Sequence, residues 1–157
     1  MADVNRLRLQ RGKLNEKFND ELYKFLDWCS KEFPWIKDFV IFRDLAWGYT
    51  KVYQYKLIMN WCKYVNDKYK EKILAEEKDF FLGLDKDDIL ANIEDENHKK
   101  DLLETFDFNK VLHFKEIFAS DNFSPISEKK IFTNMQILNK LSEKFMEIHN
   151  QLDQMAF

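Results

Sequence analysis

The sequence contains few of the residues that build turns. Its 157 residues include only three glycines and two prolines. A β-sandwich or β-barrel needs a turn about every 8–12 residues, and glycine and proline are among the residues that form such turns. The apolar residues recur at spacings of three and four rather than two, which is the period of a helix face. The sequence therefore predicts an all-α fold.

Cysteines and long apolar runs are also scarce. Cys29 and Cys62 have no metal-binding or redox-motif spacing, and each lies on the apolar side of a predicted helix, where a thiol acts as a small apolar group. The longest purely apolar run, Phe39 to Phe42, is far shorter than the roughly 20 residues of a membrane span. The N-terminus shows no apolar signal-peptide region. We therefore expect no membrane span, and a location in the cytoplasm or another reducing compartment.

Motifs for catalysis and for metal binding are lacking as well. The three histidines do not cluster with cysteine, which argues against zinc, and the glycines lie too far apart to form a phosphate-binding loop. The acidic segment that begins at Asp85 fails as a calcium loop. Ile89 and Leu90 stand where that loop requires an oxygen ligand and a turn glycine. We predict that the protein is not an enzyme and has no cofactor and no metal site.

Aromatic residues, in contrast, make up 16% of the chain. Seven of them fall between Ala46 and Leu74. On a helix, the polar positions of this stretch form one narrow stripe, while apolar positions cover more than half of the circumference, whereas an ordinary surface helix has an apolar stripe of about 100°. This pattern predicts a long central helix, from about residue 49 to 78, that contacts neighbours on at least two sides.

The remaining elements are also predicted to be helical. The apolar spacing becomes helical at Leu14, and Pro34 is expected to stop that helix because the residue before a proline avoids the α region. An apolar segment follows at 35–45, a helix end is expected at Gly83, and further helices are expected after Asp85 and over 102–119. The length suits one domain. We therefore predict a single all-α domain of five to seven helices over residues 14–157.

The last predicted helix begins near residue 128, with Ser127 as its N-cap. Its apolar residues alternate steps of three and four over more than three heptads, with Asn134 as one polar residue in the row. Such a row is typical of a coiled-coil-like contact. It packs either inside its own domain or against another chain, and the second interpretation predicts a set of partner-binding residues: Ile131, Leu138, Leu141, Phe145, Ile148, Leu152 and Met155.

Residues 1–13 form a predicted basic N-terminal arm. Arg6, Arg8 and Arg11 are three of the four arginines in a chain whose net charge is −3. The arm either reaches nucleic acid or an acidic protein surface, or it is a solvated first turn. A row of lysines from Lys51 to Lys72 alternates with tyrosines and could also contact nucleic acid. Most of these tyrosines share a helix side with core residues, which weakens that interpretation.

These features together favour a non-catalytic structural or interaction subunit of a larger protein assembly. Its partners would be other protein subunits, including copies of itself, bound through the C-terminal helix face and the basic arm. Lysine strongly outnumbers arginine, a bias that follows AT-rich coding and is common in large DNA viruses, some phages, low-GC bacteria and certain protists. A narrower prediction is therefore a minor capsid-type component of a virus particle. The alternative is a small regulatory protein that binds nucleic acid through the basic arm and the lysine row.

Overall fold

The structure is a computed structural model, and it describes residues 2–35, 38–82 and 123–155. The described residues form helices joined by short turns and contain no β-strand, which confirms the predicted all-α fold. The predicted helix end at Gly83, the helix after Asp85 and the helix over 102–119 lie outside the described residues.

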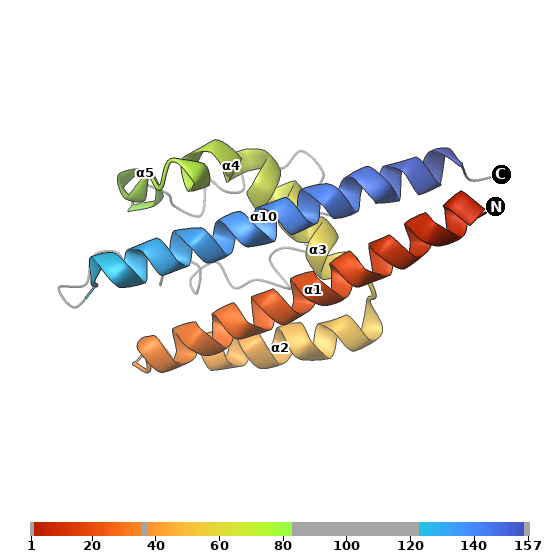
Figure 1. Cartoon of the computed structure of the whole chain (residues 1–157). Helices are drawn as coiled ribbons and strands as arrows, with labels where there is room; N and C mark the ends of the chain where they lie inside the picture. Colours follow the sequence, from red (N-terminus) through yellow and green to blue (C-terminus); the bar gives the residue numbers. More distant parts are fainter. Residues whose placement is uncertain (1, 36–37, 83–122, 156–157) are drawn as a thin grey trace, which may run out of the picture.

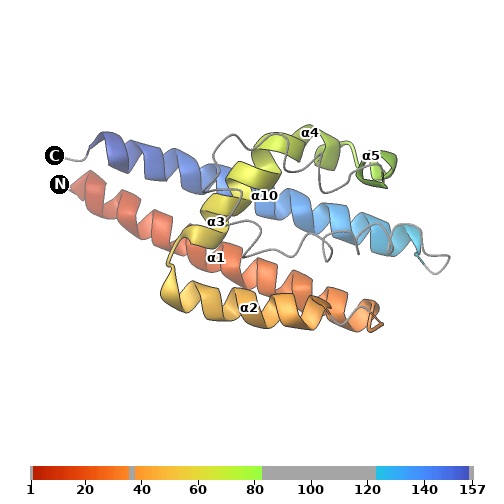
Figure 2. The same ribbon diagram turned by 180° about the vertical axis from the view of Figure 1, so that it is seen from behind.

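Two long helices form the main framework of the fold. α1 (Ala2–Glu32) and α10 (Pro125–Gln154) lie side by side and antiparallel, with the beginning of α1 next to the end of α10 (Figures 1 and 2). A polar contact at each end fixes their register. Ser127 Oγ donates a hydrogen bond to Glu32 Oε1 (3.1 Å) at one end, and Arg11 Nη1 donates to His149 Nδ1 (3.2 Å) at the other.

Both long helices begin earlier than the sequence predicts. α1 ends at Glu32, two residues before Pro34, as expected, but it begins at Ala2 and passes through Gly12 without a break. α10 begins at Pro125, and its N-cap is Ser124, whose Oγ accepts a hydrogen bond from the Ser127 N–H (3.0 Å). The predicted cap at Ser127 is therefore wrong. Proline fits the first helical position because its missing N–H would have no partner there.

The central aromatic helix is shorter than predicted. α2 (Asp38–Val52) ends at a turn, after which α3 (Lys56–Trp61), a π-helix η1 (Cys62–Asn66) and α4 (Asp67–Leu74) follow one another without interruption. Residues from elsewhere in the chain hold the turn. Asn15 Nδ2 donates to the Gln54 carbonyl (2.9 Å), and the Arg11 guanidinium lies 4.8 Å from the centre of the Tyr55 ring. The break thus depends on tertiary contacts rather than on a local glycine or proline.

The end of α4 is also earlier than predicted, at Leu74 rather than near Lys78. Glu76 has a φ of 53°, the left-handed conformation that usually calls for glycine. The N–H of Glu77 donates to the carbonyl of Lys72 (3.0 Å), and the N–H of Glu76 donates to that of Ile73 (3.1 Å). These two bonds are the Schellman ending of a helix. No glycine marks it in the sequence, and α5 (Lys78–Leu82) follows directly.

The core lies where α1, α10 and the α3–α4 segment meet. α3, η1 and α4 all contact α10, while α2 packs along the other side of α1, at the edge of the molecule (Figures 1 and 2). Burial of one large apolar side chain is worth about 1.5–3 kcal/mol, so this cluster dominates stability. Its members are buried phenylalanines together with aliphatic residues and a cysteine: Phe18, Phe25, Cys29, Phe33, Phe39, Ile58, Ile73, Ile131, Phe132, Leu138, Leu141 and Phe145.

Candidate interaction surface

Most of the predicted C-terminal row faces the interior of its own domain. Ile131, Leu138, Leu141 and Phe145 are buried in the core shared with α1 and the α3–α4 segment. The Phe145 ring, for example, lies 5.2 Å from the Tyr55 ring. A partner that reached these four residues would have to displace helices of this chain.

The end of the same row is more open. Ile148 and Leu152 are half-buried, and Met155 is exposed. The last turns of α10 therefore remain accessible, and partner binding through them stays a prediction.

The predicted basic arm is the first part of α1, and its three arginines have different surroundings. Arg6 and Arg8 are exposed, and Arg6 lies 3.9 Å from Asp3. Arg11 is half-buried because it is held between His149 and Tyr55. Arg11 thus joins α1 to α10, and it is not presented to an outside partner.

The lysine row is partly neutralised by carboxylates of the chain. Lys70 forms an ion pair with Glu143 of α10, and Lys72 Nζ lies 2.9 Å from Glu77. The hydrogen bond from Lys70, with a smaller contribution from Asn66, holds the pKa of the Glu143 carboxyl below its ordinary value. The two lysines are therefore poorly placed to bind phosphates.

A polar layer crosses the interior between η1 and α10. Trp61 Nε1 donates to Asn139 Oδ1 (2.8 Å), and Asn66 Nδ2 donates to Glu143 Oε1 (3.1 Å). Asn139 is only 4% exposed, and its Nδ2 has no hydrogen-bond partner among the residues that the structure describes. Sequence reasoning missed this layer and expected Asn134 to be the polar residue of the row. Asn134 instead donates to the Lys130 carbonyl of its own helix (2.8 Å).

The two cysteines are buried, as predicted from their position on apolar helix sides. Burial raises the pKa of both the Cys29 and the Cys62 thiols, so both are protonated at neutral pH and neither is activated as a nucleophile. In the described ranges, no three or more His, Cys, Asp or Glu side chains are grouped so that they could hold a metal ion. The described helices also include none that is long and apolar enough to span a membrane.

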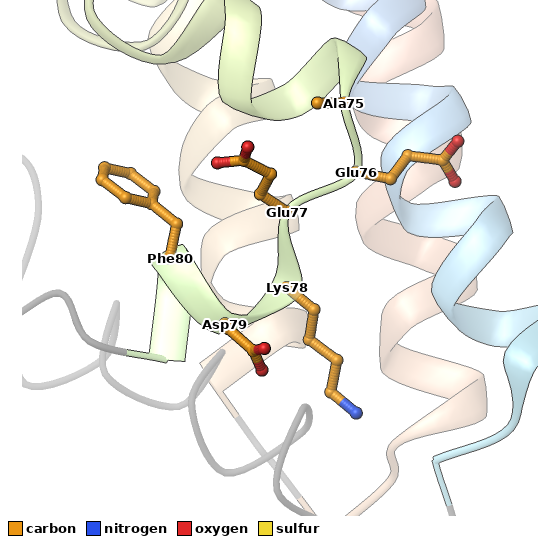
Figure 3. A pocket seen from close by; sticks show the side chains of 6 residues that line it. All are labelled: Ala75, Glu76, Glu77, Lys78, Asp79 and Phe80. Atoms are coloured by element: carbon orange, nitrogen blue, oxygen red, sulfur yellow. The ribbon is translucent and has the colours of Figure 1, made fainter.

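A hollow of about 450 Å³ lies at the turn between α4 and α5, lined by residues 75–80 (Figure 3). Glu76 points toward α10, where its carboxylate lies 2.7 Å from Lys129 Nζ, whereas Glu77 and Phe80 point away from α10. Glu77 is already paired with Lys72. The carboxylates of residues 76 and 77 therefore have cationic partners within the chain, and we assign this hollow no role.

The outward side of α2 carries several of the exposed large apolar side chains of the described residues. We define the α2 outer face by five of them, Val40, Ile41, Leu45, Trp47 and Val52, and the charged residues among them whose side chains are described are Asp44 and Lys51. On a helix wheel at 100° per residue these positions fall on one side of α2. The exposed fractions are 41% for Val40, 42% for Ile41, 58% for Leu45, 54% for Trp47 and 71% for Val52.

The inward side of α2 combines a core residue with an ion pair. Phe39 is 2% exposed and belongs to the core, but one turn further Arg43 Nη1 donates to Asp27 Oδ1 of α1 (2.8 Å). Hydrogen bonds from Lys31 and then from Arg43 hold the pKa of the Asp27 carboxyl below its ordinary value. Among the described side chains of α2, Phe39 and Arg43 thus attach the helix to the rest of the chain, while most of its described aliphatic residues face outward.

Sequence reasoning did not single out this face, because the segment 35–45 is apolar on nearly every side. The signal that could have identified it is the spacing of Ile41, Leu45, Gly48 and Val52, which advances by four, three and four residues. That spacing matches the row in α10, on a much shorter helix.

Comparison of the chain with protein families, with curated proteins and with solved structures found no match.

Proposed function

We propose that the protein is a non-catalytic structural or interaction subunit of a larger protein assembly. The observation that supports this function is the α2 outer face. Soluble monomers rarely expose large contiguous apolar patches, and exposed patches of this kind mark sites of protein contact. Covering a side chain such as Leu45 or Val52 removes it from water, which is worth about 1.5–3 kcal/mol when burial is complete.

The chemistry of the face also favours a protein partner over a nucleic acid. Its two charged residues, Asp44 and Lys51, have opposite signs, so their charges cancel. The pair therefore creates no positive potential that would attract phosphates. Trp47 supplies a large ring of the kind enriched at protein interfaces. That ring contacts Tyr23 of α1 (5.9 Å between centroids) and still exposes 54% of its surface.

Chemical labelling of the face in its native surroundings tests the function. A Leu45→Cys variant places a thiol on the face, and Leu9→Cys places one at a similarly exposed apolar position of α1 (60% exposed). The native thiols of Cys29 and Cys62 are buried, so they contribute little background. The rate of maleimide labelling is compared between dilute purified protein and the cells that produce the protein.

We expect labelling of the Leu45→Cys variant to slow markedly in the cells while that of the Leu9→Cys variant changes little. Partner contact covers the first position and leaves the second open. Equal labelling of both variants in both settings would refute a function that works through this face.

The narrower form of this proposal is a component of a virus particle. It is supported by the AT-rich coding bias alone, namely the excess of lysine over arginine. Finding the protein in purified particles, at a constant ratio to the other particle proteins, is the measurement that checks it.

Nucleic-acid binding is the alternative function. Arg6, Arg8 and Lys13 are exposed along the first turns of α1 and would supply its phosphate contacts. Binding through phosphates must weaken steeply with added salt. Titration with a labelled duplex at several salt concentrations separates the two functions, because contact through an apolar face persists in salt.

A further inference from the structure

Gly48 lies in the middle of the α2 outer face. It is an interior residue of a helix, where glycine costs about 1 kcal/mol relative to alanine. A Cβ added at Gly48 would meet no atom within 4 Å, so the packing of this chain does not require a glycine there. Gly12 in α1 is equally open, but its neighbours one turn away include the exposed charged residues Arg8 and Glu16 beside a single exposed apolar residue, Leu9.

The neighbours of Gly48 are apolar instead. Leu45 and Val52 lie one turn before and after it, and Ile41 continues the row. A small residue within an apolar row allows another helix to come close, because it leaves room for a large side chain of that helix. The row therefore has the form of a helix-contact surface with a depression near its centre.

Two charged residues beside the row indicate which orientation of a second helix the face favours. Asp44 and Lys51 are seven residues apart, so they lie on the same flank of the row, the acid near its beginning and the base near its end. Asp44 is 65% exposed and lies 3.2 Å from its neighbour Arg43, and Lys51 is exposed beside Trp47. The charges of this face are therefore complementary to those of an identical face that runs in the opposite direction.

We propose that the α2 outer face binds the same face of a second copy of this chain, with the two α2 helices antiparallel about a two-fold axis. A two-fold interface requires that residue i of one copy contacts residue j of the other and the reverse. In an antiparallel helix pair, residues that flank the contact on one side face the same flank of the other helix. Asp44 of each copy then faces Lys51 of the other, twice in one dimer.

The apolar row satisfies the same symmetry. In the register that joins Asp44 to Lys51, Leu45 of each copy lies against Gly48 of the other, and Ile41 lies against Val52. The large side chain meets the smallest residue at the centre, which explains why a glycine occupies this position. In a parallel arrangement Asp44 would not face Lys51, and Leu45 would not face Gly48. Both the charge pairing and the fit of a large side chain to a small residue would then be lost.

This inference rests on the proposed function and names its partner. Because the face is one helix wide, it lies at the low end of interface size, and we expect association on the order of micromolar affinity. Two other occupants are possible outcomes of the experiment: a foreign protein, or the residues of this chain between 83 and 122.

Charge reversal tests the pairing directly. Light scattering over a micromolar concentration series gives the mass of the wild type, of Asp44→Lys, of Lys51→Asp and of the double variant. Each single reversal places two like-charged pairs in the dimer, so we expect the dissociation constant to rise by about tenfold or more. The double variant should recover wild-type association, because it exchanges the two charges within each pair.

A mixture of the two single variants sharpens this test. Asp44→Lys carries two positive charges at these positions and Lys51→Asp two negative ones, so the mixed dimer contains only opposite pairs. We expect the mixture to associate more tightly than either variant alone, with a difference that shrinks as salt rises. A wild type that stays monomeric throughout, or a dimer indifferent to every reversal, would overturn the proposal.

A second pair of variants does not depend on charge. Gly48→Leu fills the central depression and should abolish association, while Gly12→Leu, equally open in the monomer, should leave it unchanged. Far-UV circular dichroism checks that both variants remain helical. Association that survives Gly48→Leu would contradict the proposed register.

Failure of this inference and failure of the proposed function can be told apart. A purified monomer whose Leu45→Cys thiol is nevertheless protected in cells would keep the function and replace the second copy by a foreign protein. A Leu45→Cys thiol that labels slowly even in dilute monomer would mean that the chain covers its own face, and both proposals would fall.

Discussion

α10 and α2 both carry an apolar row with steps of three and four, yet the two rows end up in opposite surroundings. The row of α10 is buried against α1, with Phe145 at 0% and Leu138 at 1% exposure. The row of α2 faces solvent, with Leu45 at 58% and Val52 at 71%. A helical period therefore predicts that an apolar face exists, but it does not say whether this chain or another covers it.

The two helices also differ in the contacts that attach them to the rest of the chain. α10 is held by phenylalanines and aliphatic residues that no water reaches, and by hydrogen bonds at its ends. Among its described side chains, α2 is held by Phe39, by the ring contact between Trp47 and Tyr23, and by the ion pair between Arg43 and Asp27. Both side chains of that ion pair keep about a quarter of their surface exposed. The stability of the fold should therefore depend on α10 far more than on α2.

The largest expected effect is the loss of a core side chain of α10. Phe145→Ala should lower the free energy of unfolding by about 3–5 kcal/mol, because it removes buried apolar area and leaves a cavity. The matched change on the other row, Leu45→Ala, should stay within about 0.5 kcal/mol, because that side chain is exposed in the monomer. Urea unfolding of dilute protein measures both.

The opposite result would reverse the comparison. A Phe145→Ala protein with wild-type stability but reduced association would mean that the row of α10 is the contact between chains, the second of the two interpretations that the sequence allows. That outcome would return the predicted partner-binding residues Ile131, Leu138 and Phe145 to the surface of the isolated protein.

The next effect comes from the polar layer beside α10. Trp61→Phe removes the N–H that donates to Asn139, and it leaves both polar atoms of that buried amide without partners. We expect a loss of about 1–3 kcal/mol in the free energy of unfolding. Adding Asn139→Leu should restore most of it, because the unpaired amide is then gone. Trp47→Phe on α2 changes an exposed ring instead, so it is the control and should change stability little.

The sequence predicts much of this fold. The scarcity of glycine and proline and the apolar spacing were enough for the all-α class, for the end of α1 before Pro34 and for the long helix at the C-terminus. Each of these features is local, because it depends on residues within a few turns of one another.

The features that the sequence did not predict depend on distant contacts. The turn before Lys56 is held by Asn15 and Arg11 of α1, and the end of α4 uses Glu76 where a glycine would have been the signal. The α2 outer face was missed for the same reason. Its identity depends on which side of a largely apolar helix meets α1, and that side is marked by the contacts of Phe39 and Arg43 with residues distant in the sequence.

A smaller effect, of opposite sign, is expected at the centre of the α2 outer face. Gly48→Ala should raise the free energy of unfolding of dilute protein by about 0.5–1 kcal/mol, because alanine costs less backbone entropy and its methyl group meets no atom within 4 Å. The same protein should associate less tightly, since the methyl group occupies the space for Leu45 of the second copy. Urea unfolding and light scattering measure the two quantities separately. Gly12→Ala should share the first effect and lack the second.

The smallest effect concerns the ion pair that attaches α2. Lys31 and Arg43 depress the pKa of Asp27 in the folded protein, so its carboxylate stabilises the fold at pH values above its ordinary value of 3.8. This contribution is lost as the pH falls through the depressed folded value. Asp27→Asn should therefore lower the urea midpoint slightly at pH 7, and the gap from the wild type should close below about pH 4. A gap that persists unchanged well below pH 4, through the depressed folded pKa, would mean that the Asp27 charge does not stabilise the fold.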